Sequence, residues 1–236
     1  MISKRLYFLP ILLTLWAGTA LAATPRAEYS VRWSPTQGGP DSASSTLHAL
    51  GLHPGERSRH EVQYFEIVAP ADVPAGFKPI MRKRTDGTDT QLTYKLRGAD
   101  PLPASPRLAQ WQCPLPSPNK RKDEADVTFM AADSVRKVYS RSCTYGTRDK
   151  TASVPAALQP RSTGCISTMT RIESGKLKVE QWQMADGSTL LEASRIDRDT
   201  PAALQRFRDE VVIQLLKQHI VPVDRSKSSI GGDCTR

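Results

Sequence analysis

The chain has 236 residues and a formal net charge of +9 at neutral pH. This length allows one large domain or two small ones, and we expect one. The basic surplus suits anionic partners or solubility alone, so the placement of the charges has to decide between them. Beyond the first 22 residues no stretch approaches the roughly 20 apolar residues that span a bilayer, which argues against stable membrane insertion.

The first 22 residues are predicted to be a secretory signal peptide. A basic start, MISKR, precedes the apolar run LYFLPILLTLWAGTALA, and Ala20-Leu21-Ala22 fits a small-residue cleavage site. The alternative is an uncleaved anchor helix. We expect an exported protein, either periplasmic or secreted, and export makes nucleic acid an unexpected partner.

The rest of the chain predicts mainly strands, with one short helix early and one longer helix near the end. Alternating or β-rich segments predict strands at residues 27–33, 61–68, 80–84, 92–98, 126–130 and 134–145, then a meander over 165–196. Helices are predicted within 45–55 and over 200–219, where Thr200 caps the helix and Pro201 takes its first position. The proline-rich residues 99–126 predict an irregular loop. We therefore expect an α+β domain with mainly antiparallel strands over 23–222, followed by a polar tail over 223–236.

The predicted hairpin at residues 80–98 gathers cations on one side. Side chains alternate between the two faces of a strand. Arg82 and Arg84 then share a side of the first run, and Lys95 and Arg97 share a side of the second. Like charges on neighbouring strand positions repel one another. Either this face points to water, or an anionic ligand relieves the repulsion.

Four cysteines follow the predicted signal peptide: Cys113, Cys143, Cys165 and Cys234. An even count in an exported chain suggests up to two disulfides, and three connectivities are possible. We favour a Cys143–Cys165 bond across the short segment between them, with Cys113–Cys234 holding the tail. A zinc site is less expected because the sequence has no Cys-x-x-Cys pair.

Several segments taken in order resemble one known family. The segments EYSVR, QYFEI, IMRKR, LTYKLRG and LLEASRI resemble the CYTH domain, the triphosphate tunnel fold of adenylyl cyclases, thiamine triphosphatases and inorganic triphosphatases. In that family the first strand carries Glu-x-Glu-x-Lys, later strands carry Arg-x-Arg and Leu-Thr-x-Lys, and a late strand carries Glu-x-Glu. The resemblance implies a closed or nearly closed β-tunnel whose cations grip triphosphate and whose carboxylates hold a divalent metal ion.

The resemblance implies a set of phosphate-binding cations facing into the tunnel. This set is Arg32, Arg82, Arg84, Lys95, Arg97 and Arg141, with Lys178 as a further candidate. Arg136 and Arg141 point to opposite faces of the same predicted strand, so at most one of them can line the cavity. We favour Arg141.

The acidic half of the family pattern is reduced in this chain. The second acid of each motif is a serine, Ser30 and Ser194, which leaves Glu28 and Glu192 as candidate ligands for Mg²⁺ or Mn²⁺. Such ions need oxygen ligands, so fewer carboxylates should weaken metal binding. We therefore expect a phosphate-rich or polyanionic ligand with little or no catalysis. Two alternatives stay open: a metal-dependent triphosphatase or polyphosphatase, and a non-catalytic interaction module of the cell envelope.

Overall fold

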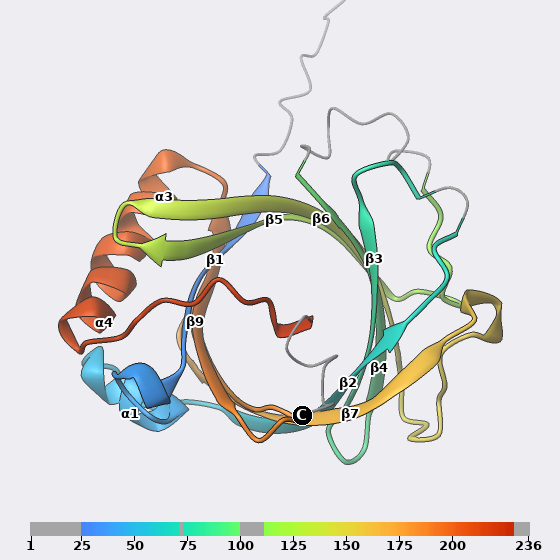
Figure 1. The fold of residues 1–236 in the computed structure, drawn as a ribbon, viewed down its shortest axis with the longest axis horizontal. Helices are drawn as coiled ribbons and strands as arrows, with labels where there is room; N and C mark the ends of the chain where they lie inside the picture. The colour runs from blue at the N-terminus through green and yellow to red at the C-terminus, as the bar shows by residue number, and fades with distance from the viewer. Residues whose placement is uncertain (1–24, 71–72, 100–110, 229–236) are drawn as a thin grey trace, which may run out of the picture.

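The computed structural model describes residues 25–70, 73–99 and 111–228. The predicted signal peptide, the end of the predicted tail and Cys234 lie outside the described residues. Within them, nine strands form one closed barrel in the order β1-β5-β6-β4-β3-β2-β7-β8-β9 (Figure 1). The predicted fold class, a mainly antiparallel sheet closed on itself, is confirmed.

The strands are long enough to enclose a cavity. Their bounds are β1 (Arg26–Trp33), β2 (Arg57–Glu66), β3 (Lys78–Thr85), β4 (Thr90–Gly98), β5 (Lys120–Ala131), β6 (Ser134–Thr147), β7 (Arg161–Ser174), β8 (Leu177–Gln183) and β9 (Thr189–Arg198). Eight of the nine neighbouring pairs are antiparallel, and the exception is the parallel pair β1–β5. Because β1 also pairs with β9, the first strand closes the ring.

Helices cover the outer face of β1, β5, β8 and β9 (Figure 1). They are α1 (Ala43–Ala49), α3 (Pro201–Phe207), a π-helical turn (Arg208–Val212) and α4 (Ile213–Lys217), with short 3₁₀ turns at Pro35–Gln37 and Ala156–Leu158. The Thr200 side chain accepts the Ala203 amide at 3.2 Å, which confirms the predicted cap. Tyr29 on β1 stacks on Phe207 with ring centroids 6.0 Å apart. Since strand side chains alternate, this outward apolar row leaves the polar residues of β1 facing the barrel interior.

A second apolar cluster covers the outer face of β3 and β4. Trp111 stacks on Tyr94 with ring centroids 5.6 Å apart, so the segment that begins at Trp111 lies across this side of the sheet. That path brings Cys113 to Cys143 on β6, and the two form a disulfide.

The favoured cysteine pairing is therefore wrong. Cys143 bonds to Cys113, which excludes both Cys143–Cys165 and Cys113–Cys234. The physical reason is topological: Cys165 lies on β7, and the strand order places β4, β3 and β2 between β6 and β7. A short separation in sequence did not mean proximity in space.

The chain after α4, including the described part of the predicted polar tail, contacts the barrel. The Val223 amide donates to the Arg32 carbonyl at 2.9 Å, and Pro222 bridges to Trp33. From there the chain crosses toward the inside of the ring of strands (Figure 1). The described part of the tail thus belongs to the barrel. Across the described ranges, no helix has the length and apolar character needed to cross a membrane.

Candidate functional site: a charged tunnel

The barrel encloses a cavity of about 440 Å³, which we call the tunnel. All nine strands and the residues Ser226, Lys227 and Ser228 contribute to its wall. Ten lysine and arginine side chains line it against four aspartate and glutamate side chains. The wall therefore carries a clear surplus of positive charge, which favours anions over cations as ligands.

The structure places most of the predicted site residues on this wall. They are Arg32, Arg82, Arg84, Lys95, Arg97, Lys178 and Glu28. Glu192 is buried and contacts two of the lining cations. Their placement follows from the alternation of each strand, while their role in binding stays a prediction.

The placement expected for Arg141 is wrong. Ser142 and Thr144 of β6 line the tunnel, so the odd-numbered Arg141 points to the outside. There its guanidinium donates to both oxygens of Asp123 at 2.6 Å. Arg136, the alternative on the same strand, forms an ion pair with Asp224 and is likewise absent from the tunnel wall.

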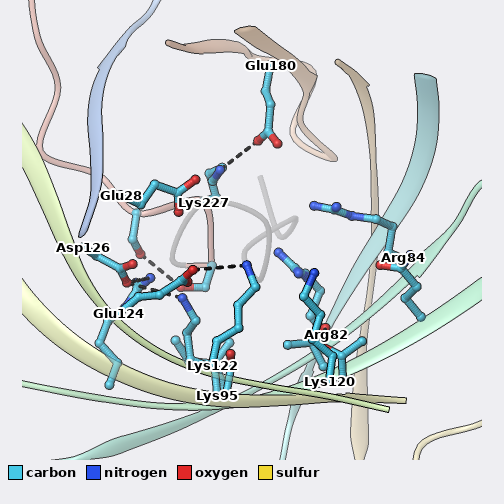
Figure 2. A pocket seen from close by; sticks show the side chains of 18 of the residues that line it. Glu28, Arg82, Arg84, Lys95, Lys120, Lys122, Glu124, Asp126, Glu180 and Lys227 are labelled. Atoms are coloured by element: carbon cyan, nitrogen blue, oxygen red, sulfur yellow. Dashed lines mark hydrogen bonds and ion pairs between the residues drawn. The ribbon is translucent and has the colours of Figure 1, made fainter. Parts of the chain in front are cut away.

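One side of the tunnel, the cationic side, consists of Arg82 and Arg84 on β3 and Lys120 on β5 (Figure 2). Among the described residues none of these three has an ion-pair partner within 4 Å. The Nε atoms of Arg82 and Arg84 are buried without a hydrogen-bond acceptor. Burial first, and then the charge of Arg82, lower the pKa of Arg84 to about 9. The charge of Glu180 acts in the opposite sense. At neutral pH the guanidinium is still protonated, so the fold holds a buried cation that has no ion-pair partner within 4 Å among the described residues.

Further along β4 the cations are already paired. Lys95 and Arg97 both reach Asp126 Oδ2, at 3.4 and 2.8 Å, and Lys122 reaches Glu124 at 3.1 Å. Burial alone would raise the pKa of Asp126, but Lys95 and Arg97 hold it below its usual value. Lys95 and Arg97 can turn to a ligand only by leaving Asp126, and Lys122 only by leaving Glu124.

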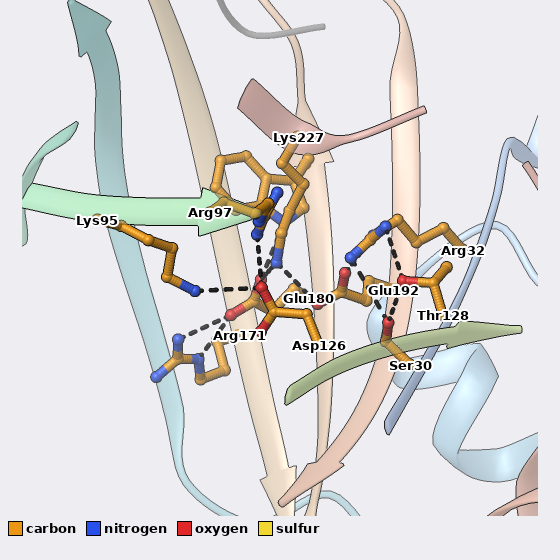
Figure 3. Close-up of polar contacts among 11 residues, drawn as sticks. Ser30, Arg32, Lys95, Arg97, Asp126, Thr128, Arg171, Glu180, Glu192 and Lys227 are labelled. Atoms are coloured by element: carbon orange, nitrogen blue, oxygen red, sulfur yellow. Dashed lines mark hydrogen bonds and ion pairs between the residues drawn. The ribbon is translucent and has the colours of Figure 1, made fainter. Parts of the chain in front are cut away.

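The opposite side, the acidic side, consists of Glu28 on β1, Glu180 on β8 and Glu192 on β9. Register places Glu180 directly opposite Glu192, with Arg171 opposite Glu180 and Arg32 opposite Glu192. Like charges in directly opposite positions destabilise a sheet. Lys227 Nζ lies between the two carboxylates, 2.8 Å from Glu180 and 2.7 Å from Glu192 (Figure 3).

Two of the three carboxyl groups of the acidic side, those of Glu28 and Glu180, differ in their proton affinity. Burial raises the pKa of Glu28, and the neighbouring Glu192 carboxylate adds to this effect. Burial acts in the same sense on Glu180, but Lys227, Arg84 and Arg171 outweigh it and hold the pKa of Glu180 well below its ordinary value. Glu180 is therefore a paired anion, whereas Glu28 is a half-buried acid with a raised pKa.

Of the two predicted metal ligands, Glu192 has no oxygen free for a metal ion. Glu192 uses one oxygen for Arg32 and the other for Lys227. Ser30 and Ser194 lie directly opposite each other, and the hydroxyl of Ser30 lies 3.3 Å from that of Thr128. Across the described residues no group of three or more His, Cys, Asp or Glu side chains is placed to hold a metal ion.

Sequence reasoning missed part of the wall. The missed residues are Lys120, Lys122, Glu124, Asp126, Arg171, Glu180 and Lys227. Residues 120–126, for which an irregular loop was predicted, form the first half of β5. They read KRKDEAD, with charge at every position except Ala125, so no period of two marked them as a strand. Nothing in the local pattern indicates that Lys227 enters the barrel.

Comparisons with known proteins give only distant similarities. No family model matches the chain, and no curated protein matches it. Similar solved structures include the PH1012 protein of Pyrococcus horikoshii, with 12% identity, a TM-score of 0.47 and coverage of 86% of this chain and 98% of that one. A Vibrio parahaemolyticus protein described as a candidate adenylate cyclase has 10% identity, a TM-score of 0.48 and coverage of 87% and 98%.

A candidate adenylyl cyclase from Hippeastrum, described as having a dominant triphosphatase activity, has 10% identity and a TM-score of 0.44. The match covers 86% of this chain and 93% of that one. Similarities at this level assign neither a family nor an activity to the present protein.

Proposed function

We propose that the tunnel binds a linear, phosphate-rich anion and turns it over slowly or not at all. One observation carries the proposal: the half-buried Arg82 and the buried Arg84 face the cavity, their Nε atoms lack a hydrogen-bond acceptor, and neither has an ion-pair partner within 4 Å among the described residues. A buried charge without a counter-ion is costly, and a bound anion would remove that cost. Guanidinium groups suit phosphate because two N–H groups can bind one phosphate through parallel hydrogen bonds.

The wall also suits a chain of phosphates better than a single one. Lys120 and Lys122 lie on β5, and Arg82 and Arg84 lie on β3, so cations face the cavity from more than one direction (Figure 2). The cavity volume of about 440 Å³ lies in the range of sites for small-molecule ligands. An extended polyanion could contact several of these cations at once.

The same geometry argues for binding over hydrolysis. Metal-assisted phosphoryl transfer needs carboxylate oxygens that are free to coordinate. The oxygens of Glu180 and Glu192 instead accept hydrogen bonds from Arg171, Lys227 and Arg32. Slow or absent turnover follows from acids that already have partners.

Calorimetric titration with tripolyphosphate tests the proposal. Arg84→Gln should weaken binding about tenfold or more, because a charge-assisted hydrogen bond contributes about 1.5–3 kcal/mol. Arg141→Gln is the matched control, since it removes the same charge from the outer face and should leave the affinity close to that of the wild type. Affinity should fall as salt rises from about 0.02 to 0.15 M. No heat with the wild type at low salt, or equal losses in the two variants, would refute the proposal.

A metal-dependent triphosphatase is the second candidate. It is favoured by the presence of Glu28 in the same cavity as the cations. Release of phosphate from tripolyphosphate with Mg²⁺ or Mn²⁺ would have to depend on Glu28, so equal rates for the wild type and Glu28→Gln would remove this candidate. An envelope interaction module loses its main argument, because Arg82, Arg84 and Lys95 face inward.

Export is part of the same proposal. The Cys113–Cys143 bond is of a kind that persists in oxidising compartments. Mass spectrometry of the protein from fractionated cells should find an N-terminus at Ala23 outside the cytoplasm. A cytoplasmic protein that begins at Met1 would contradict this.

A further inference from the structure

Four charged residues form a row around the acidic side of the barrel at one level. Arg171, Glu180, Glu192 and Arg32 occupy directly opposite positions on β7, β8, β9 and β1. Two carboxylates are thus adjacent in the middle of the row, with one guanidinium at each end. Like charges in directly opposite positions destabilise a sheet, so a cation between the two acids would relieve their repulsion.

The described part of the tail supplies that cation. Lys227 Nζ donates to Glu180 Oε2 at 2.8 Å and to Glu192 Oε1 at 2.7 Å. It also lies 5.2 Å from the centre of the Trp182 ring, and a ring face attracts a cation. Burial alone would lower the pKa of Lys227, but Glu180 and Glu192 raise it above its usual value. Lys227 is thus a half-buried lysine whose ammonium is held by two carboxylates.

These contacts leave no carboxylate oxygen of the pair unused. Glu180 Oε1 accepts from Arg171 at 2.7 Å, and Glu180 Oε2 accepts from the Trp182 indole at 3.1 Å as well as from Lys227. Glu192 Oε2 accepts from Arg32. A divalent ion would have to displace several charge-assisted hydrogen bonds before it could coordinate here.

The backbone holds Lys227 in this position. Pro222 bridges to Trp33, and the Val223 amide donates to the carbonyl of Arg32. The tail is therefore fixed to β1 four residues before Lys227, which shortens the stretch that could carry the ammonium away. Figure 3 shows Lys227 reaching the acidic residues while Arg32 approaches Glu192 from the other direction.

We propose that Lys227 is a tethered cation that takes the place of a divalent metal ion between Glu180 and Glu192, so that the tunnel takes up its anion in metal-free form. The statement about the anion rests on the proposed function. The statement about the ammonium does not, because it concerns which cation the two acids hold.

The binding of Mn²⁺, followed by electron paramagnetic resonance in the absence of any phosphate compound, tests whether Lys227 takes the place of a metal ion. The wild type and the control Lys137→Met, which removes an outer-face lysine, should show no saturable site in the tunnel. Lys227→Met should bind Mn²⁺ at least about tenfold more tightly than the wild type, since its buried acids then lack a cation. Adding Glu192→Gln should abolish that gain. A wild-type site that Glu192→Gln removes, or no gain in Lys227→Met, would overturn the proposal.

Titration with tripolyphosphate in the presence and absence of Mg²⁺ tests whether the tunnel binds the anion without a metal ion. Mg²⁺ should weaken the binding of tripolyphosphate to the wild type, because it sequesters the free anion. In Lys227→Met, Mg²⁺ should weaken this binding less, or should strengthen it. Tighter wild-type binding with Mg²⁺ would contradict the inference. A wild type that binds no tripolyphosphate under any condition refutes the proposed function, and the manganese experiment then still decides the role of Lys227.

Amine acetylation of the native wild type covers the case in which Lys227→Met does not fold. Lys78 and Lys176 are exposed and serve as internal references. A buried ammonium paired to two acids should react at least about tenfold more slowly than these lysines, as read by peptide mass spectrometry. Equal reactivity would show that Lys227 leaves the acids freely and would overturn the tethered-cation assignment.

Discussion

The two sides of the tunnel differ in whether their charged side chains have partners within the protein. On the acidic side, Glu180 and Glu192 have internal partners in Arg171, Arg32 and Lys227. On the cationic side, Arg82 and Arg84 have no such partner among the described residues. Buried charges that lack partners cost stability, and sites that keep them tend to be functional. The contrast therefore points to the cationic side as the place where an external ligand completes the structure.

The largest expected effect comes from removing a partner on the acidic side. Lys227→Met should lower the free energy of unfolding by about 3–5 kcal/mol, because it leaves buried carboxylates without their cation. Urea denaturation measures this change. The control Lys137→Met breaks a surface ion pair with Asp199 and should cost no more than about 1 kcal/mol. Similar losses in both variants would mean that the acidic side is not internally balanced.

Removing the disulfide should destabilise the sheet behind the cationic side. The bond closes 30 residues of chain, for which loop entropy gives about 3.5 kcal/mol, and measured values are commonly about 2–4 kcal/mol. The double variant Cys113→Ser/Cys143→Ser should lose this amount in urea denaturation and should bind tripolyphosphate more weakly. Unchanged binding would show that the cationic side does not depend on the Trp111 segment packed behind it.

Removing a cation from the cationic side should raise the free energy of unfolding, whereas the two changes above lower it. Arg84→Met should raise the free energy of unfolding by about 1 kcal/mol, because a buried charge without a counter-ion is replaced by an apolar group of similar length. The same variant should lose affinity for tripolyphosphate. Arg141→Met, in which the charge is paired on the outer face, should not gain stability. A loss of stability in Arg84→Met would mean that Arg84 already has a compensating partner.

The smallest expected effect is a change in pH dependence. The pKa of Glu180 is lower in the folded protein than its ordinary value of 4.5. Such an acid contributes stability above the unfolded pKa, and this stability is lost as the pH falls through the folded pKa. The wild type should therefore lose more stability than Glu180→Gln on acidification below about pH 4.5. Urea denaturation across that range measures the difference, with the exposed Glu66→Gln as the control; parallel pH curves for wild type and Glu180→Gln would contradict the pairing.

How much could be predicted from sequence depended on whether the signal was local. The alternation in β3 and β4 placed Arg82, Arg84, Lys95 and Arg97 on one face, and these residues do line the tunnel. A period of two identifies a shared face without any knowledge of neighbouring strands. The same rule failed for Arg141 because the choice between the two faces of β6 depends on register with β4 and β5.

The other half of the site depends on contacts between distant parts of the chain. Lys227 reaches Glu180 across 47 positions, and Cys113 reaches Cys143 on a path set by Trp111 packing. No periodicity reports such contacts, because they follow from the order of strands in the barrel. That Arg82 and Arg84 have no ion-pair partner among the described residues could therefore be seen only in the folded structure.

The single parallel pair has a consequence for how the protein is made. β1 is synthesised before the other strands, yet its two neighbours are β5 and β9, about 100 and 160 residues further along. Pairings of such long range slow folding, since the connecting chain must be ordered before they form. Because β1 closes the ring by pairing with β9, the barrel cannot close before β9 has been synthesised, and no shorter nascent chain would offer a ligand a complete tunnel.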